Sequence, residues 1–171
     1  RGAGPEERAA LAAALTAGRA WLADRWPAWD APVARAFELV VLAEDEAGAP
    51  PRTTRAFPGL LAAAPRDPEA TARMLVIETA RRLAHDALDG LSLVEDTPRE
   101  SFAAWAGRGA SLAERIADLL VQALVLDVLP GAPGPGAAAA EALRAEPGLT
   151  PAGAALIDGI ARRIIDRADR G

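Results

Sequence analysis

A helical stripe of charged side chains around the only histidine is the pattern in this sequence best suited to chemistry. Its four residues follow one another at spacings of four, three and four: Glu78, Arg82, His85 and Asp89. On a helix, such spacings bring side chains within about 60° of one another around the axis. Carboxylates beside an imidazole favour its protonated form and orient the ring, which suits general acid–base catalysis. The stripe therefore predicts His85, Glu78 and Asp89 as catalytic residues and Arg82 as a ligand-binding residue.

A solvated helix face is the second interpretation of the same stripe. Amphipathic helices usually carry charged residues opposite their apolar face, and opposite charges four residues apart stabilise a helix. Glu78 and Arg82 have this spacing, and so do Arg82 and Asp86. Under this interpretation the stripe faces water and does no chemistry.

The segment 81–93 also resembles the phospho-acceptor helix of the histidine kinases. His85 and Asp86 match the His-Asp pair of that motif, and Arg82 matches its upstream arginine. The resemblance implies phosphotransfer at His85. Three features depart from the family: Glu78 lies at a different offset from the family's upstream Glu-Arg, the predicted helix stops at Gly90, and only helical segments follow where an ATP-binding domain is expected.

Carboxylates upstream of this helix could serve a ligand. Glu38 lies between Phe37 and Leu39, so its burial would require an arginine partner. We predict it as a ligand-binding residue in a pocket between helices. The acidic run 44–46 is predicted at a helix end beside a loop, where carboxylates are usually solvated. The paired Glu-x-x-His motifs of di-metal bundles are absent, so neither a metal nor a cofactor is expected.

Most of the aromatic residues are tryptophans, with four Trp, three Phe and no Tyr. Trp21, Trp26 and Trp29 lie within nine residues around the first predicted interhelix turn, and Trp105 lies far downstream. Packing at a helix corner explains the group. The alternative is a ligand pocket or a partner surface, because both are enriched in aromatic side chains. On that alternative Trp21 and Trp29 are ligand-binding residues.

Composition excludes several kinds of chemistry. The chain has no cysteine and one histidine, which excludes thiolate metal sites, thiol catalysis and multi-histidine sites within one chain. It has no lysine, and its formal net charge of −5 does not provide the basic field of a nucleic-acid binder. No apolar run reaches the length of a membrane span. We therefore expect a cytoplasmic protein with no nucleic-acid or membrane partner.

Prolines and capping residues mark the predicted helix starts, because proline is favoured at the first helical position. Ser111 and Glu114 form a capping box. The predicted helices cover residues 5–26, 32–47, 67–89, 97–107, 111–129, 137–146 and 151 onward, with one or two helical turns at 57–64. The Pro/Gly-rich run 130–136 is predicted as a flexible linker.

Alanine and leucine, with 44 and 21 residues, favour helix over strand. We expect one all-α domain over residues 1–171. It would be an antiparallel bundle of about five main helices plus short ones, with the last helix docked after the linker. The predicted helix 111–129 is apolar nearly all round, so it should be central or lie in an interface.

Three functions are compatible with this sequence. The first is a non-catalytic helical interaction or regulatory domain that forms a homodimer or binds a partner protein through an apolar helix surface, and that belongs to a longer chain. The second is a small-molecule-binding domain or an acid–base enzyme with a pocket reached by His85, Glu38 and arginines. The third is phosphotransfer at His85.

Overall fold

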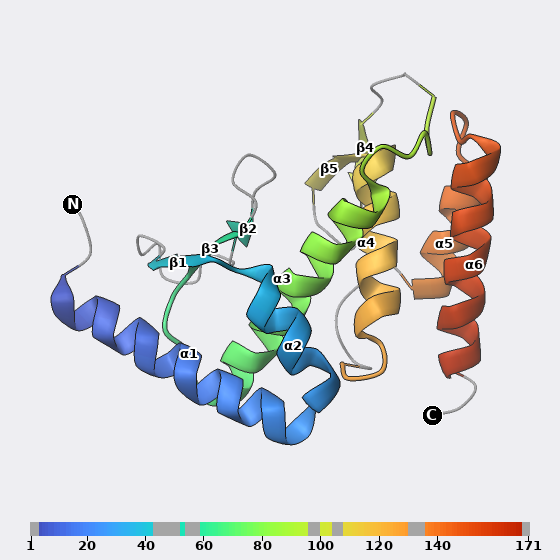
Figure 1. The fold of residues 1–171 in the computed structure, drawn as a ribbon. Coiled ribbons are helices and arrows are strands. Elements are labelled where there is room, and N and C mark those ends of the chain that lie inside the picture. Colours follow the sequence, from blue (N-terminus) through green and yellow to red (C-terminus); the bar gives the residue numbers. More distant parts are fainter. Residues whose placement is uncertain are drawn as a thin grey trace. The chain divides into compact units, whose positions relative to one another are not determined.

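The structure is a computed structural model and is predominantly helical (Figure 1). It describes residues 4–42, 52–53, 59–95, 100–103, 108–129 and 136–168. The chain divides into two compact units, Arg1–Arg82 and Leu83–Gly171, which are described separately. The boundary between them falls within one helix. Trp105, the acidic run 44–46 and residues 130–135 of the predicted linker lie outside the described residues.

Six helices account for most of the described residues, and the strands are short, so the fold is all-α as predicted. The helices are α1 (Pro5–Arg25), α2 (Pro27–Ala36), α3 (Pro68–Leu88), α4 (Leu112–Val125), α5 (Gly136–Arg144) and α6 (Pro151–Ala168). None of them is both long and apolar enough to cross a bilayer.

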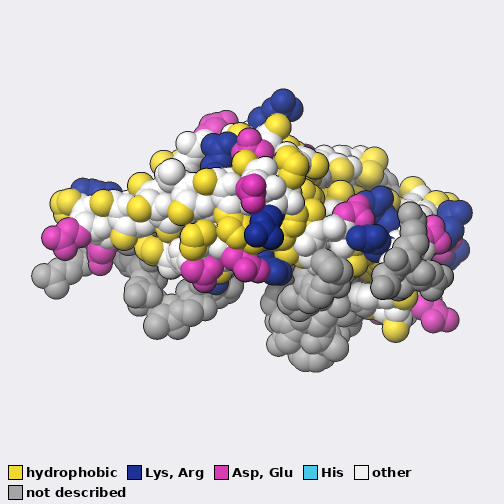
Figure 2. Space-filling model, turned by 90° about the horizontal axis from the view of Figure 1, so that it is seen from below, with side chains coloured by type: hydrophobic (Ala, Val, Ile, Leu, Met, Phe, Trp, Pro, Cys, Tyr) yellow, Lys and Arg dark blue, Asp and Glu magenta, His cyan; other side chains and the backbone are white. Residues whose placement is uncertain are grey.

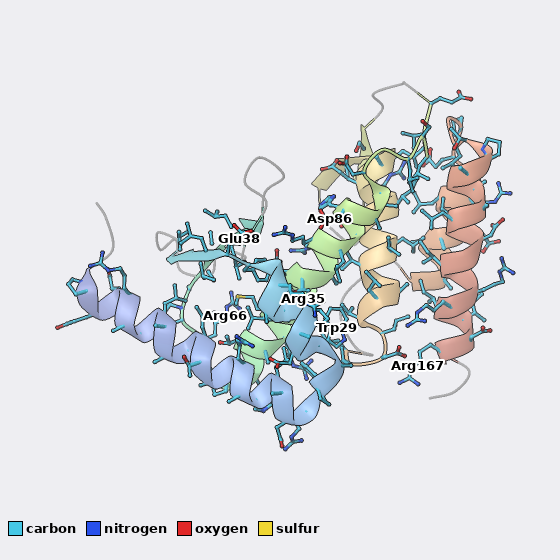
Figure 3. The ribbon with its side chains drawn as sticks, viewed as in Figure 1. Trp29, Arg35, Glu38, Arg66, Asp86 and Arg167 are labelled. Atoms are coloured by element: carbon cyan, nitrogen blue, oxygen red, sulfur yellow. The ribbon has the colours of Figure 1, made fainter. Side chains whose placement is uncertain are left out.

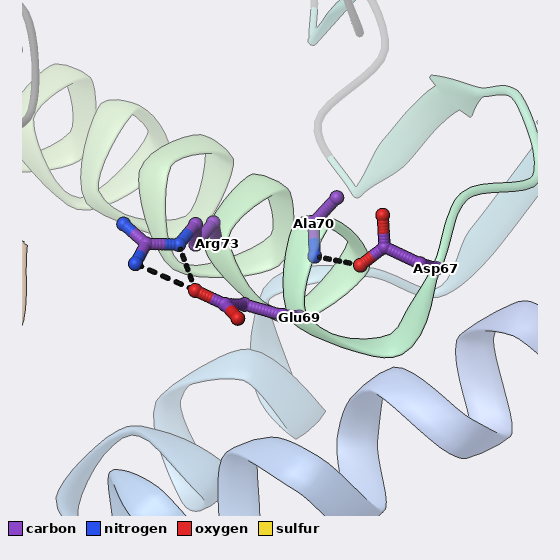
Figure 4. A network of polar contacts seen from close by, with 4 residues as sticks. All are labelled: Asp67, Glu69, Ala70 and Arg73. Atoms are coloured by element: carbon purple, nitrogen blue, oxygen red, sulfur yellow. Dashed lines mark hydrogen bonds and ion pairs between the residues drawn. The ribbon is translucent and has the colours of Figure 1, made fainter.

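Local capping explains where α3 and α4 begin. The Asp67 carboxylate accepts a hydrogen bond of 2.8 Å from the Ala70 amide at the start of α3, as Figure 4 shows. In α4 the predicted capping box forms: the Glu114 amide donates to Ser111 Oγ at 3.2 Å, and the Ser111 amide donates to Glu114 Oε2 at 2.8 Å. These bonds satisfy amides that have no partner within the helix. Both predicted starts are confirmed.

Helices α1 and α2 pack beside the first half of α3 in unit 1. At Gly18 of α1, an added Cβ would lie 2.4 Å from Thr71 Cγ2 of α3. Only glycine therefore permits this close approach of the two helices. Leu22 and Leu61 are fully buried in the same unit.

A small sheet replaces two predicted helical segments in unit 1. Its strands are β1 (Leu39–Leu42), β2 (Arg52–Thr53) and β3 (Leu60–Ala63), in the order β1-β3-β2. Strand β1 runs parallel to β3 with Leu39 opposite Leu60, whereas β2 pairs with β3 in the antiparallel direction. The prediction of helix was wrong at residues 39–42 and 60–63, whereas residues 32–36 of the first predicted segment are helical. Short apolar runs fit a buried strand as well as a helix, and only non-local pairing decides between them.

Helix α2 also begins earlier than predicted. Pro27 is its first residue, and Pro32 lies inside the helix. Pro27 has the fixed φ that suits a first helical position, so it begins the helix one turn before the proline that the prediction chose. The helix ends at Ala36, because Phe37 adopts an extended conformation.

Unit 2 is built around α4, which packs against α5 and α6 (Figure 1). Its buried core comprises Leu93, Ile116, Leu119, Ala123, Leu126, Ala140, Leu143, Ile157, Ile160 and Ile164. Ile116, Leu119 and Ala123 place α4 in this core, whereas Leu120 and Leu124 are only partly buried. This packing favours the central position, one of the two predictions for this helix. The bundle arrangement holds for these three helices.

A β-hairpin precedes α4 in unit 2. Strands β4 (Glu100–Ala103) and β5 (Arg108–Ser111) pair in the antiparallel direction, with Glu100 opposite Ser111. The predicted helix over 97–107 is thus wrong for its described residues. So short a helix is marginal by itself, and strand pairing satisfies the same backbone groups.

The start of α6 is joined to the segment after α3. Thr150 donates a 3.1 Å bond from its amide to the Leu93 carbonyl and a 2.7 Å bond from its hydroxyl to the Ser92 carbonyl. The same hydroxyl accepts from the Gly153 amide at 3.1 Å, so Thr150 caps the start of α6. A Cβ at Gly153 would lie 2.1 Å from the Leu93 carbonyl oxygen, so the two backbones touch.

Candidate functional site

Exposure increases along the predicted stripe on α3. Glu78 is 1% exposed, Arg82 and His85 are half-buried, and Asp89 is exposed. The Glu78 carboxylate accepts a hydrogen bond from Arg81 Nη1, one turn further along the helix. Burial of a carboxylate is costly unless it is paired, and this ion pair offsets that cost. Glu78 is therefore buried and does not lie on a solvated face.

The other half of the stripe belongs to unit 2. The Nδ1 atom of His85 is shielded from solvent although the ring as a whole is half-buried. Asp86, labelled in Figure 3, and Asp89 are exposed. The half-buried His85 is thus the least exposed of these three residues. Its role in acid–base chemistry or phosphotransfer stays a prediction.

Arg82 and Glu38 come close together at a turn in unit 1. Arg82 Nη1 donates to the carbonyl of Ala36, the last residue of α2. A Cβ at Gly59 would lie 3.2 Å from that same Nη1 atom and 3.5 Å from Glu38 Cγ. Glu38 itself is exposed (Figure 3). The arginine thus satisfies a carbonyl at the C-terminal end of a helix, where the residues within the helix offer no donor.

Gly59 gives this turn its shape. Its φ is +88°, a conformation that residues with a Cβ rarely adopt. Its carbonyl accepts hydrogen bonds from the amides of Glu38 at 2.9 Å and Leu39 at 3.1 Å, and these bonds align β1 with β3. The convergence of Arg82 and Glu38 predicted for a pocket therefore occurs at a structural turn.

The tryptophans form a corner between α1 and α2. Trp26 lies between the two helices, and its ring meets Trp21 edge to face with centroids 4.8 Å apart. The Arg25 guanidinium lies over the Trp21 ring at 5.8 Å, and the Arg73 guanidinium lies over Trp26 at 5.9 Å. Trp29, labelled in Figure 3, follows one turn later and is half-buried like the other two. These residues are neither fully in the core nor fully in water.

Arg115 is a buried charge that sequence reasoning missed. Its side chain is 9% exposed, and its Nη1 donates to Glu146 Oε1 at 2.9 Å. Among the described residues, its Nε has no hydrogen-bond partner. The signal was present in the sequence, because Arg115 directly precedes the apolar stretch of α4. The ion pair connects α4 to the residues that follow α5.

The described residues contain no group of three or more His, Asp or Glu side chains placed to hold a metal ion. No protein-family model matches this chain, and no curated protein matches it. The residues themselves are therefore the basis for the function proposed below.

Proposed function

We propose that this chain is a non-catalytic helical interaction domain that associates with a second copy of itself. The observation that carries the proposal is the state of Glu78. It is the only buried carboxylate among the described residues, and it is held in an ion pair with Arg81. An acid held in this way is poorly placed to exchange protons with a substrate.

Arg82 supports the same conclusion. Its guanidinium is engaged with the Ala36 carbonyl and packs at Gly59, so it contributes to the end of α2. Two of the charged residues expected to bind or convert a small molecule, Glu78 and Arg82, thus take part in holding helices together. What the described surface does offer is large apolar side chains: Leu39, Leu83, Leu91 and Ile165 are 43% to 54% exposed.

Self-association is tested by the molar mass in solution. Light scattering of the intact chain after size-exclusion chromatography, at loading concentrations from micromolar to submillimolar, should show a mass that rises towards that of a dimer. A mass that stays at the monomer value over the whole range would contradict the proposal.

A further inference from the structure

We propose that the tryptophan corner, formed by Trp21, Trp26 and Trp29 with the charged residues around them, is the surface through which two copies of this chain associate. This inference rests on the proposed function and names the surface that performs it. All its residues belong to unit 1. The occupant that we infer is the same corner of a second copy, related by a two-fold axis.

The rings of the corner are held in place before any partner arrives. The rings of Trp21 and Trp26 pack edge to face at an interplanar angle of 78°. The guanidinium of Arg25 lies over Trp21, and that of Arg73 lies over Trp26. Trp29 is tied to Trp26 by a 2.9 Å bond between its amide and the Trp26 carbonyl. Rigid aromatic groups lose little entropy on association, and tryptophan and arginine dominate the energetics of protein interfaces.

The charges around the rings are balanced. Three ion pairs are exposed there: Arg19–Asp30 at 2.9 Å, Arg25–Asp24 at 3.2 Å and Arg73–Glu69 at 2.7 Å. Their side chains are 42% to 78% exposed. The local charge is therefore zero, whereas the whole chain carries −5. Figure 4 shows the Glu69–Arg73 pair on the first turns of α3.

This charge balance is what favours a second copy as the partner. A two-fold interface brings a patch against itself, so a patch of one sign would repel its own copy. Interspersed arginines and carboxylates allow each arginine to face a carboxylate across the axis. A strongly acidic or basic partner would gain no net electrostatic attraction from a neutral patch. Figure 2 shows the wider pattern on one face, where basic and acidic side chains are scattered among hydrophobic ones.

The test reverses one charge in the corner and one elsewhere. Arg25→Glu keeps all three tryptophans, removes the guanidinium over Trp21 and gives the corner a net negative charge. Arg162→Glu, at an exposed position on α6, changes the total charge equally and is the matched control. Sedimentation velocity of the intact chain should show the dimer dissociation constant raised at least about tenfold by Arg25→Glu and nearly unchanged by Arg162→Glu.

Mixing two variants of opposite corner charge provides a test in which association should be restored. Asp24→Arg makes the corner positive, so it should also weaken self-association, and a mixture of Arg25→Glu with Asp24→Arg should recover a heterodimer. If the wild-type chain dimerises and both glutamate variants dimerise equally well, the corner is not the interface but self-association stands. If the wild-type chain is monomeric throughout, both the surface and the proposed function are wrong.

Discussion

At the scale of single residues, α3 carries one stripe with two different environments. Thr71, Leu75 and Glu78 are spaced by four and three and are all buried, and the same stripe continues through His85 to exposed Asp89. The sequence predicted the spacing but not the burial. Helical periodicity identifies which side chains share a face, whereas the neighbours of that face come from distant segments such as α1. Glu78 was for this reason a candidate catalytic acid in the sequence and a buried ion pair in the structure.

Two buried threonines on α3 allow a matched measurement of how much a buried hydroxyl contributes to the free energy of unfolding. Thr79 Oγ1 is buried and has no hydrogen-bond partner among the described residues, whereas Thr71 Oγ1 donates to the Arg66 carbonyl at 3.3 Å. Valine has nearly the same shape and the same β-branching. Thr79→Val should therefore leave the free energy of unfolding unchanged or raise it by up to about 1 kcal/mol.

Thr71→Val should lower the free energy of unfolding by about 1 kcal/mol, since it leaves a carbonyl without its donor. Urea titrations followed by circular dichroism would measure both variants against the wild type. A clear loss of stability in Thr79→Val would mean that its hydroxyl is satisfied after all, and the account of this position would fail.

At the scale of elements, helix starts were far more predictable than strands. Local signals marked four of the starts correctly: proline at the first position marks α1, α3 and α6, and the Ser111 hydroxyl marks α4. The strands depend on partners distant in sequence: β1 is parallel to β3, some twenty residues away. A four-residue apolar run such as Leu39–Leu42 contains too little periodicity to distinguish a strand from a helix. The same limit applies to the hairpin of β4 and β5.

Two glycines of α6 test how closely this helix approaches the segment after α3. Gly153→Ala would place a Cβ 2.1 Å from the Leu93 carbonyl oxygen, and backbone atoms would have to move. This substitution should destabilise the protein by about 1–3 kcal/mol. Gly159 on the same helix has open space around its Cβ position. Gly159→Ala should stabilise by about 0.5–1 kcal/mol, because alanine favours helix.

Measured by thermal and urea unfolding, the free energy of unfolding should thus fall in Gly153→Ala and rise in Gly159→Ala. Equal effects in both would show that the contact between Gly153 and Leu93 is absent in solution.

Helix α4 offers a second comparison between neighbours. Leu119 is fully buried in the core of unit 2, while Leu120 is only partly buried. Leu119→Ala removes contacts and leaves a cavity, so it should cost about 2–5 kcal/mol in the free energy of unfolding. Leu120→Ala should cost no more than about 2 kcal/mol. Similar losses at both positions, measured by urea denaturation, would be inconsistent with the orientation of α4.

At the scale of the whole molecule, the core of unit 2 includes residues of the apolar helix α4, whereas Trp21, Trp26 and Trp29 lie half-buried at a corner of unit 1. Helix α4 packs against α5 and α6, so we propose the tryptophan corner, and not α4, as the surface for a second copy. The tryptophans were recognised as a candidate partner surface from their clustering alone. Their ring geometry and the balance of charges around them required the structure, because Arg73 reaches the corner from a helix far away in the sequence.

Sedimentation equilibrium of the wild-type chain tests self-association most directly, since it needs no variant and no assumption about the interface. The monomer mass is 17.7 kDa. We predict that the weight-average mass rises with concentration and approaches twice that value. A mass that remains at 17.7 kDa at every concentration would contradict it.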